Sequence, residues 1–173
     1  VDPRFTRTAA KADEFVRQRS GGDIPFLFGL CYHIFKNGWE DKQYIHDRVY
    51  GMEKVKDEIL AKWTPDKVEE ACGVPEAQVA KVAEMLAKNR PSTVVWCMGQ
   101  TQHTIGNAMV RASCILQLAL GNVGLPPSGG AQSQQPLPPP RHLASGLASG
   151  LASGLAGQGS LGAPALRRRR DSD

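Results

Sequence analysis

One stretch of the chain, residues 92–124, constrains the fold more than any other. It begins with a run of β-branched and aromatic residues at 93–96. A short apolar run of this kind is typical of a strand that is buried on both faces of a parallel sheet. From Ile105 the apolar residues recur at helical spacing, until Gly121 and Asn122 predict the end of the helix. The stretch therefore predicts a strand, a loop and a helix, which is one unit of an α/β fold.

The loop of this unit, residues 98–104, joins the carboxyl end of the predicted strand to the amino end of the predicted helix. Open α/β sheets bind ligands at such corners, and the amide groups at a helix amino terminus favour anions. A cofactor with phosphates is one interpretation. In the other, Thr101 or Thr104 only caps the helix and Gly99 forms an ordinary turn. Position alone does not decide between them.

The residues before this unit predict mainly helices. Asp23 follows the loop 20–22 and lies where the N-cap of a helix is expected. The helix predicted at 24–36 is apolar on nearly every side, so it must be packed inside a larger body. Capping, proline and glycine signals predict further helices over 41–48, 52–63 and 65–72, and from Pro75 through Leu86. An α-rich insertion thus precedes the strand-loop-helix unit.

The amino-terminal segment places Asp2, Arg4 and Thr6 within one turn, and it begins as a fragment of a longer protein would. A carboxylate, a guanidinium and a hydroxyl in this arrangement could hold a ribose, a phosphate or the edge of a base. The residues alone favour the alternative, a solvated turn with a helix cap at Thr6.

Charge and cysteine spacing exclude several classes of protein. The net charge of +4 reflects the run Arg167–Arg170, and the residues before Leu125 are near neutral, so no nucleic-acid partner is expected. The cysteines form no CxxC pair and the histidines lack metal-ligand spacing, which argues against a zinc site or a disulfide framework. A reducing, cytoplasmic setting fits this pattern. No apolar run approaches the ~18 residues of a membrane span.

The composition changes abruptly after Gly124. Residues 125–173 contain Pro138-Pro139-Pro140, three Leu-Ala-Ser-Gly repeats from Leu143, and the arginine run. Such a segment cannot bury enough apolar surface to fold. We therefore expect a partial domain at 1–124 and a disordered, low-complexity tail at 125–173. Out-of-frame translation is the favoured explanation of this tail, and a genuine linker with a basic end is the alternative.

Four motifs resemble those of a known family: DPRFTRTA at the start, SGGD before the buried helix, TPDKVEEACGVPEAQVAKVAEMLAKN, and WCMGQTQHTIGNAMVRASCILQLALGNVG. They occur in the order and with the spacing of the molybdopterin oxidoreductases (formate dehydrogenase/DMSO reductase-like). Residues 1–124 are most similar to the catalytic alpha subunit of cytoplasmic, NAD-linked formate dehydrogenase. The resemblance does not extend to residues 125–173, where the family continues in a glycine-rich segment.

The resemblance implies a helix-rich fragment of an α/β domain with a strand-loop-helix cofactor corner. The cofactor implied is bis(molybdopterin guanine dinucleotide) with molybdenum or tungsten, held between several subdomains of a longer chain. The family's cofactor contacts match Asp2, Arg4 and Thr6 in the first turn, Gly22 and Asp23 in the loop that reads guanine, and Met98, Gly99 and Gln102 in the loop that touches the pterin.

The resemblance also implies that Arg111 is catalytic and holds the carboxylate of formate beside the metal. Asn107 and Arg111 lie one turn apart on the polar side of a predicted core helix, and a buried guanidinium needs an anionic partner. An ordinary salt bridge is the alternative. The metal ligand is expected upstream of Val1, so neither Cys97 nor His103 is assigned to the metal. The iron-sulfur clusters of the intact subunit are also expected outside this chain.

The function implied is therefore that of a fragment of an enzyme that oxidises formate to carbon dioxide. Electrons would pass through iron-sulfur clusters to NAD, with flavin and iron-sulfur subunits as partners. One alternative is a nitrate reductase or another molybdopterin enzyme. Another is a stand-alone, non-catalytic module that binds a nucleotide or an acidic partner.

Overall fold

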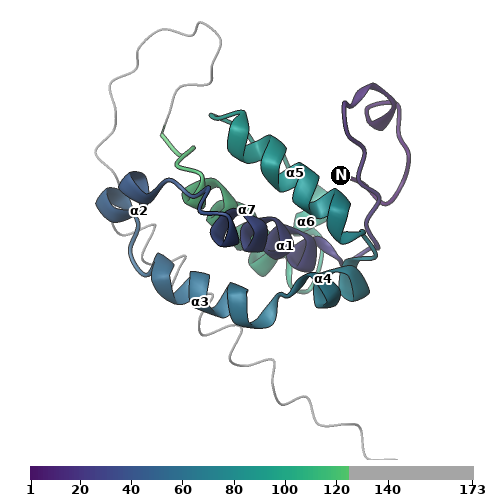
Figure 1. Ribbon diagram of the computed structural model, residues 1–173. Helices are drawn as coiled ribbons and strands as arrows, with labels where there is room; N and C mark the ends of the chain where they lie inside the picture. The colour runs from purple at the N-terminus through teal and green to yellow at the C-terminus, as the bar shows by residue number, and fades with distance from the viewer. Residues whose placement is uncertain (125–173) are drawn as a thin grey trace, which may run out of the picture.

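The computed structural model describes residues 1–124, and these residues form helices joined by loops (Figure 1). The predictions for 125–173 lie outside the described residues. In chain order the elements are η1 (Ala9–Lys11), α1 (Asp23–Lys36), α2 (Lys42–Arg48), α3 (Met52–Lys62), α4 (Pro65–Cys72), α5 (Glu76–Lys88), α6 (Met98–Thr101) and α7 (Gly106–Ala119).

Helix α1 forms the centre of this arrangement. It packs against α3, α4, α5 and α7, and Figure 1 shows it lying between α5 and α3. Phe28 and Ile34 on α1 have no exposed surface. The prediction that this helix is packed inside a larger body is therefore confirmed, because its apolar residues face several neighbours at once.

Helix α1 also packs closely against α4 and α5, and Gly29 makes this approach possible. A Cβ atom at Gly29 would lie 2.7 Å from Cγ1 of Val68 and 3.2 Å from Cγ1 of Val79. Any larger residue at this position would push the three helices apart.

The predicted helix boundaries agree with the structure to within two residues, and the local signals account for this. Asp41 caps α2, because its carboxylate accepts a hydrogen bond of 2.9 Å from the amide of Tyr44. Pro65 begins α4, and Gly73 follows that helix with a φ of 73°. The prediction of Asp23 as an N-cap is wrong: Gly22 is the N-cap of α1, and Asp23 is its first residue.

The predicted strand at 93–96 is also wrong. No strand occurs within residues 1–124, and the part of the chain described is helical rather than α/β. Val95 is 89% exposed, although the pattern predicted burial on both faces. A strand forms only when a neighbouring strand accepts its backbone hydrogen bonds, and the described chain supplies no such neighbour. In place of the predicted strand, loop and helix, the chain therefore continues from α5 through an irregular segment into α6 and α7.

Helix α7 ends at the signal that the sequence predicted. Gly121 has a φ of 70°, and its amide donates to the carbonyl of Leu118 over 3.2 Å. The amide of Asn122 donates to the carbonyl of Gln117 over 3.0 Å. This pair of bonds is a Schellman motif, which satisfies the last carbonyl groups of the helix.

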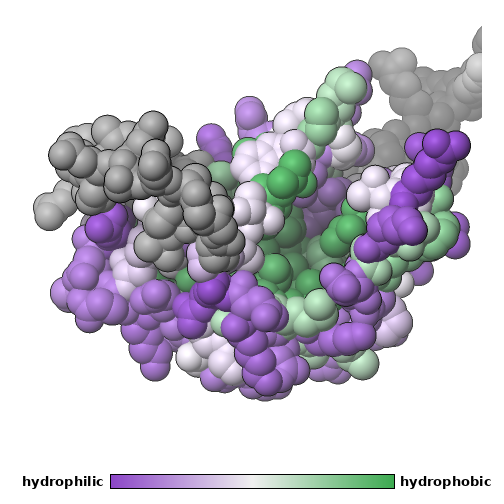
Figure 2. All heavy atoms as spheres, turned by 90° about the horizontal axis from the view of Figure 1, so that it is seen from above, coloured by the Kyte–Doolittle hydropathy of each residue, from purple (hydrophilic) through white to green (hydrophobic). Residues whose placement is uncertain are grey.

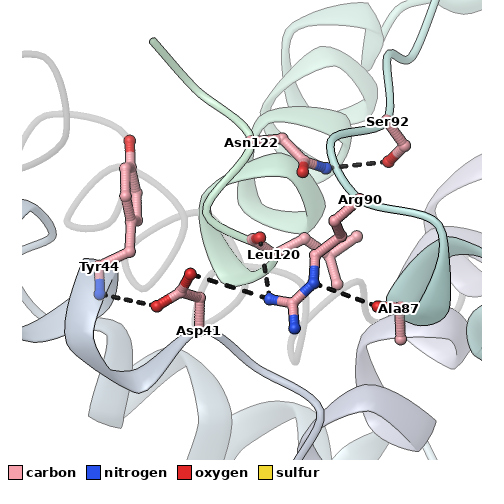
Figure 3. Close-up of polar contacts among 7 residues, drawn as sticks. All are labelled: Asp41, Tyr44, Ala87, Arg90, Ser92, Leu120 and Asn122. Atoms are coloured by element: carbon pink, nitrogen blue, oxygen red, sulfur yellow. Dashed lines mark hydrogen bonds and ion pairs between the residues drawn. The ribbon is translucent and has the colours of Figure 1, made fainter. Parts of the chain in front are cut away.

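Arg90 joins three helix ends at the start of the irregular segment (Figure 3). Its Nε donates to the carbonyl of Ala87 over 3.1 Å, and its Nη1 donates to the carbonyl of Leu120 over 3.2 Å. The same guanidinium lies 3.9 Å from the carboxylate of Asp41. These contacts hold the ends of α5 and α7 beside the start of α2, and so fix where residues 92–97 leave the helical body.

Candidate functional site

An open groove of about 740 Å³ lies on one face of the described chain. Three segments that are distant in sequence border it: 1–3, 18–23 and 93–103. Figure 2 shows one face of the molecule hollowed, with hydrophobic side chains at the bottom of the hollow. The apolar lining of the groove comes largely from α1, α5 and α7: Phe26, Leu27, Leu30, Val82, Leu86 and Leu116.

The groove brings together the three groups of residues that the sequence analysis assigned to a cofactor. Asp2 from the first group, Asp23 from the second and Gly99 from the third all line it. Gly22 lies in the chain between two lining residues, Gly21 and Asp23. Segments separated by up to about a hundred residues therefore meet at one cavity, which is what a shared ligand requires.

Other members of these groups do not line the groove. Arg4 and Thr6 belong to a local turn, in which Asp2 accepts a 2.7 Å hydrogen bond from the amide of Arg4 and the Thr6 hydroxyl accepts one of 3.1 Å from Ala9. Met98 is 63% exposed, and Gln102 is also exposed. These residues reach a ligand only if it extends beyond the groove.

Gly22, beside the groove residue Asp23, is packed closely against the chain. A Cβ atom at Gly22 would lie 2.9 Å from the carbonyl oxygen of Arg19 and 3.0 Å from Cα of Cys72, so glycine is required here. Asp23 is 8% exposed. Within residues 1–124 its carboxylate has neither a hydrogen bond nor an ion pair.

The sequence analysis missed one residue of this site, Gln18. It lines the groove and is only 7% exposed, and its Oε1 is buried without a hydrogen-bond partner in the described residues. No sequence signal marks it, because a glutamine before a glycine-rich loop has neither periodicity nor a motif.

The charge of the groove differs from the expectation of a phosphate site. Asp2 and Asp23 line it, and no lysine or arginine of the described chain does so. The nearby Arg17 and Arg19 donate instead to the carbonyls of Pro3 and Glu70, over 3.2 and 2.6 Å. The groove therefore suits a ligand rich in N–H donors better than an anion.

The segment predicted as a loop at 98–104 contains a short helix, α6, that packs on α7. The Ser113 hydroxyl of α7 donates to Oε1 of Gln100 over 3.1 Å, and a Cβ at Gly106 would lie 2.4 Å from the carbonyl of Thr101. The N-cap of α7 is Ile105, and no side chain caps it. Capping of α7 by Thr101 or Thr104 is therefore not observed.

Arg111 lies apart from the groove. It is half-buried on α7 and does not line the cavity, while Asn107 one turn before it is exposed. Ser113, which contacts the groove residue Gln100, lies about 200° around the helix from Arg111. The predicted catalytic arginine thus does not line the groove that Asp2, Asp23 and Gly99 border.

The cysteines differ strongly in their surroundings. Cys97 is exposed and lines the groove, whereas Cys31 is fully buried, and burial raises its pKa to about 12. No group of three or more His, Cys, Asp or Glu side chains in residues 1–124 is arranged to hold a metal ion. In the same part of the chain, no helix has the length and apolarity needed to cross a membrane.

Comparison with known proteins gives relatives of one kind. No protein-family model matches the chain. The F420-dependent formate dehydrogenase 2 subunit alpha of Methanococcus maripaludis is 30% identical over 75% of this chain and 19% of its own length. The nitrate-inducible formate dehydrogenase major subunit of Escherichia coli is 31% identical over 75% of this chain and 18% of its own.

A solved structure shares the fold. Acetylene hydratase from Pelobacter acetylenicus matches with a TM-score of 0.67 and 28% identity, over 70% of this chain and 16% of that protein. The chain thus spans about a fifth of the length of the curated relatives that it matches. The described residues are a helical segment that matches a small part of much longer enzymes. The chain belongs to the molybdopterin oxidoreductase family.

Proposed function

We propose that the chain is part of the catalytic alpha subunit of a formate dehydrogenase, which oxidises formate to carbon dioxide. The observation that carries this proposal is the meeting of Asp2, Asp23 and Gly99 at one groove. The names of the sequence relatives support formate as the substrate. A nitrate reductase or another molybdopterin enzyme is less well supported, because none of these relatives is named for nitrate reduction.

The cofactor that we propose is bis(molybdopterin guanine dinucleotide) with molybdenum or tungsten. When bound, it supplies the centre that takes up two electrons as formate becomes carbon dioxide and a proton. The groove residues fit its heterocyclic parts, because the carboxylate of Asp23 is available to N–H donors. They fit its phosphates less well, because no lysine or arginine of the described residues lines the groove.

In the intact enzyme, Arg111 would bind the carboxylate of formate through its guanidinium, which matches a carboxylate with two parallel hydrogen bonds. The electrons would pass through iron-sulfur clusters and flavin-containing partner subunits to NAD in the cytoplasm. Some of the relatives are named for F420 instead, so the electron acceptor is tested separately, by supplying each coenzyme to the purified enzyme.

The decisive experiment replaces Arg111 by alanine in the intact parent enzyme. We expect kcat/KM for formate to fall by a factor of roughly a hundred or more, because a charge-assisted bidentate contact to the substrate is lost. Lys54→Ala, which removes a positive charge from the exposed face of α3, is the control and should leave turnover unchanged. Near-normal formate oxidation by the Arg111→Ala enzyme would contradict the proposal.

A stand-alone binding module is the alternative from a different class, and the coding DNA discriminates the two. We expect that shifting the reading frame near Gly124 restores a coding sequence rich in glycine and asparagine, which would continue the alpha subunit. An intact frame whose transcript ends as the chain does would favour the module instead.

A further inference from the structure

A side chain of α7 holds one edge of the segment after α5 in the way that a neighbouring strand would. In the orientation that satisfies both of its groups, the side-chain amide of Gln117 donates to the carbonyl of Ser92 and accepts from the amide of Val94, each over 3.1 Å. Along an extended chain, the backbone groups of every second residue point to the same edge. Both bonds therefore lie on one edge, where Gln117 takes the place of a strand.

The opposite edge of this segment has no partner among the described residues. Thr93 and Val95 alternate with Ser92 and Val94, so their amide and carbonyl groups point away from Gln117. In the part of the chain that the structure describes, none of these groups makes a hydrogen bond. Thr93 is exposed, and Val95 is 89% exposed. An exposed edge with unpaired backbone groups is a template for a strand of another chain.

The segment also lacks the features that keep natural sheet edges from pairing. Residues 92–97 contain no charged residue and no proline, which are common means of protecting an edge. Val94 is partly buried against the core whereas Val95 is exposed, so successive side chains alternate as they do in a strand. Packing against helices on one face gives the support that a two-stranded ribbon needs. The edge therefore fits an extended, uncharged backbone.

We propose that this edge pairs with the same edge of a second copy of the chain, which forms a symmetric antiparallel dimer. Pairing centred on Val94 places Thr93 of one copy opposite Val95 of the other, and each such pair exchanges both of its backbone hydrogen bonds. Every unpaired group of the edge is then satisfied, because the segment is complementary to itself. The dimer is closed, since Gln117 occupies the far edge of each strand.

The test measures the mass of the 173-residue chain by sedimentation velocity over a wide range of concentration. The original chain should pass from monomer to dimer and form no larger species. Val95→Pro should weaken dimerisation roughly tenfold or more, because each copy loses an amide donor at the paired edge. Val95→Thr is the matched control: it keeps the amide and the β-branch but reduces the apolar surface, so it should dimerise as the original chain does.

Disulfide trapping reports the register of the pair. The exposed Cys97 is first replaced by serine. In that background Val94→Cys should form a covalent dimer under mild oxidation, because opposite residues at the centre of the pair lie within reach of a disulfide. Val95→Cys should be trapped far more slowly, since its two copies lie diagonally across the pair. Circular dichroism reports whether each variant folds, and trapping decides the outcome if Val95→Pro does not.

A chain that stays monomeric at every concentration, or that grows beyond a dimer, would overturn the inference. So would equal weakening by Val95→Pro and Val95→Thr, because exposed apolar surface would then cause the association. Protection of the Thr93 and Val95 amides from hydrogen exchange in the monomer would also overturn it, since another segment of the same chain would then cover the edge. These outcomes are distinct from failure of the formate proposal, which the Arg111→Ala enzyme decides by turnover alone.

Discussion

Single side chains at the groove and in the core differ in whether the fold uses their polar atoms. Gln18 and Asp23 have polar groups that the described fold does not satisfy, whereas Asp41 and Arg90 have theirs engaged at helix ends. Unsatisfied groups at a cavity indicate a ligand, and satisfied ones indicate a structural role. Buried polar atoms without a partner also occur away from the groove lining, on Glu40, Trp63 and Asn122.

His33 provides a pH-dependent prediction at this scale. It is 7% exposed on α1, and burial lowers its pKa, which the charge of Glu76 partly opposes. Above about pH 6.5 the histidine is neutral in both the folded and the unfolded chain. As the pH falls below that value, the unfolded chain takes up the proton first, so the free energy of unfolding should fall until the pH passes the folded pKa.

The measurement is urea unfolding of the original chain and of His33→Gln at pH 7.5 and 5.5. The original chain should lose more stability between these pH values than the variant, which has no titrating group at this position. An equal loss in both proteins would show that His33 is not the source.

Contacts between helix ends hold α5, α7 and the segment after α5 together. The Schellman motif ends α7 at Gly121, and the side chain of Arg90 then ties the ends of α5 and α7 together (Figure 3). The segment from Ser92 to Cys97 starts from this junction and borders the groove. Asn122 donates to the hydroxyl of Ser92 over 2.9 Å, which adds a second tie between α7 and this segment. The groove border therefore depends on contacts made between helix ends.

Replacing Arg90 by alanine should lower the free energy of unfolding by about 1–3 kcal/mol, because two carbonyl groups lose a charged donor. Urea unfolding followed by circular dichroism gives this value. Lys54→Ala removes the same charge from an exposed site and should change stability by less than about 0.5 kcal/mol. A loss no greater than that of the control would show that Arg90 is not a structural tie.

At the scale of the whole molecule, the described residues match a small part of longer enzymes. The groove is open, Arg111 does not line it, and the chain spans about a fifth of the length of its relatives. Under the proposed function, the contacts that a large cofactor needs on its other sides would come from other parts of the intact enzyme. The apolar side chains of Val95 and Met98 are exposed in the described part of the chain.

The isolated chain should therefore bind no metal cofactor stably, should not oxidise formate, and should self-associate as its concentration rises. The test is expression in a host that makes the cofactor, followed by metal analysis, formate-dependent dye reduction and light scattering. Stoichiometric molybdenum or tungsten together with measurable turnover would contradict this prediction.

The sequence by itself determined the helices and the family. Helix boundaries depend on local signals, such as Pro65 at the start of α4 and Gly121 after α7, whose effects extend over a few residues only. The motifs likewise indicated three cofactor-binding groups, one member of each of which borders the groove.

Only the tertiary structure decided strand pairing, side-chain burial and the charge of the groove, because these properties depend on residues that are distant in sequence. The apolar run at 93–96 has the composition of a strand, but the described chain offers no partner strand, and Val95 is exposed. Burial of Gln18 without a partner, and the acidic character of the groove, result from how three separate segments meet. Sequence patterns report a residue's neighbours along the chain, whereas pairing, burial and electrostatic surroundings are set by neighbours in space.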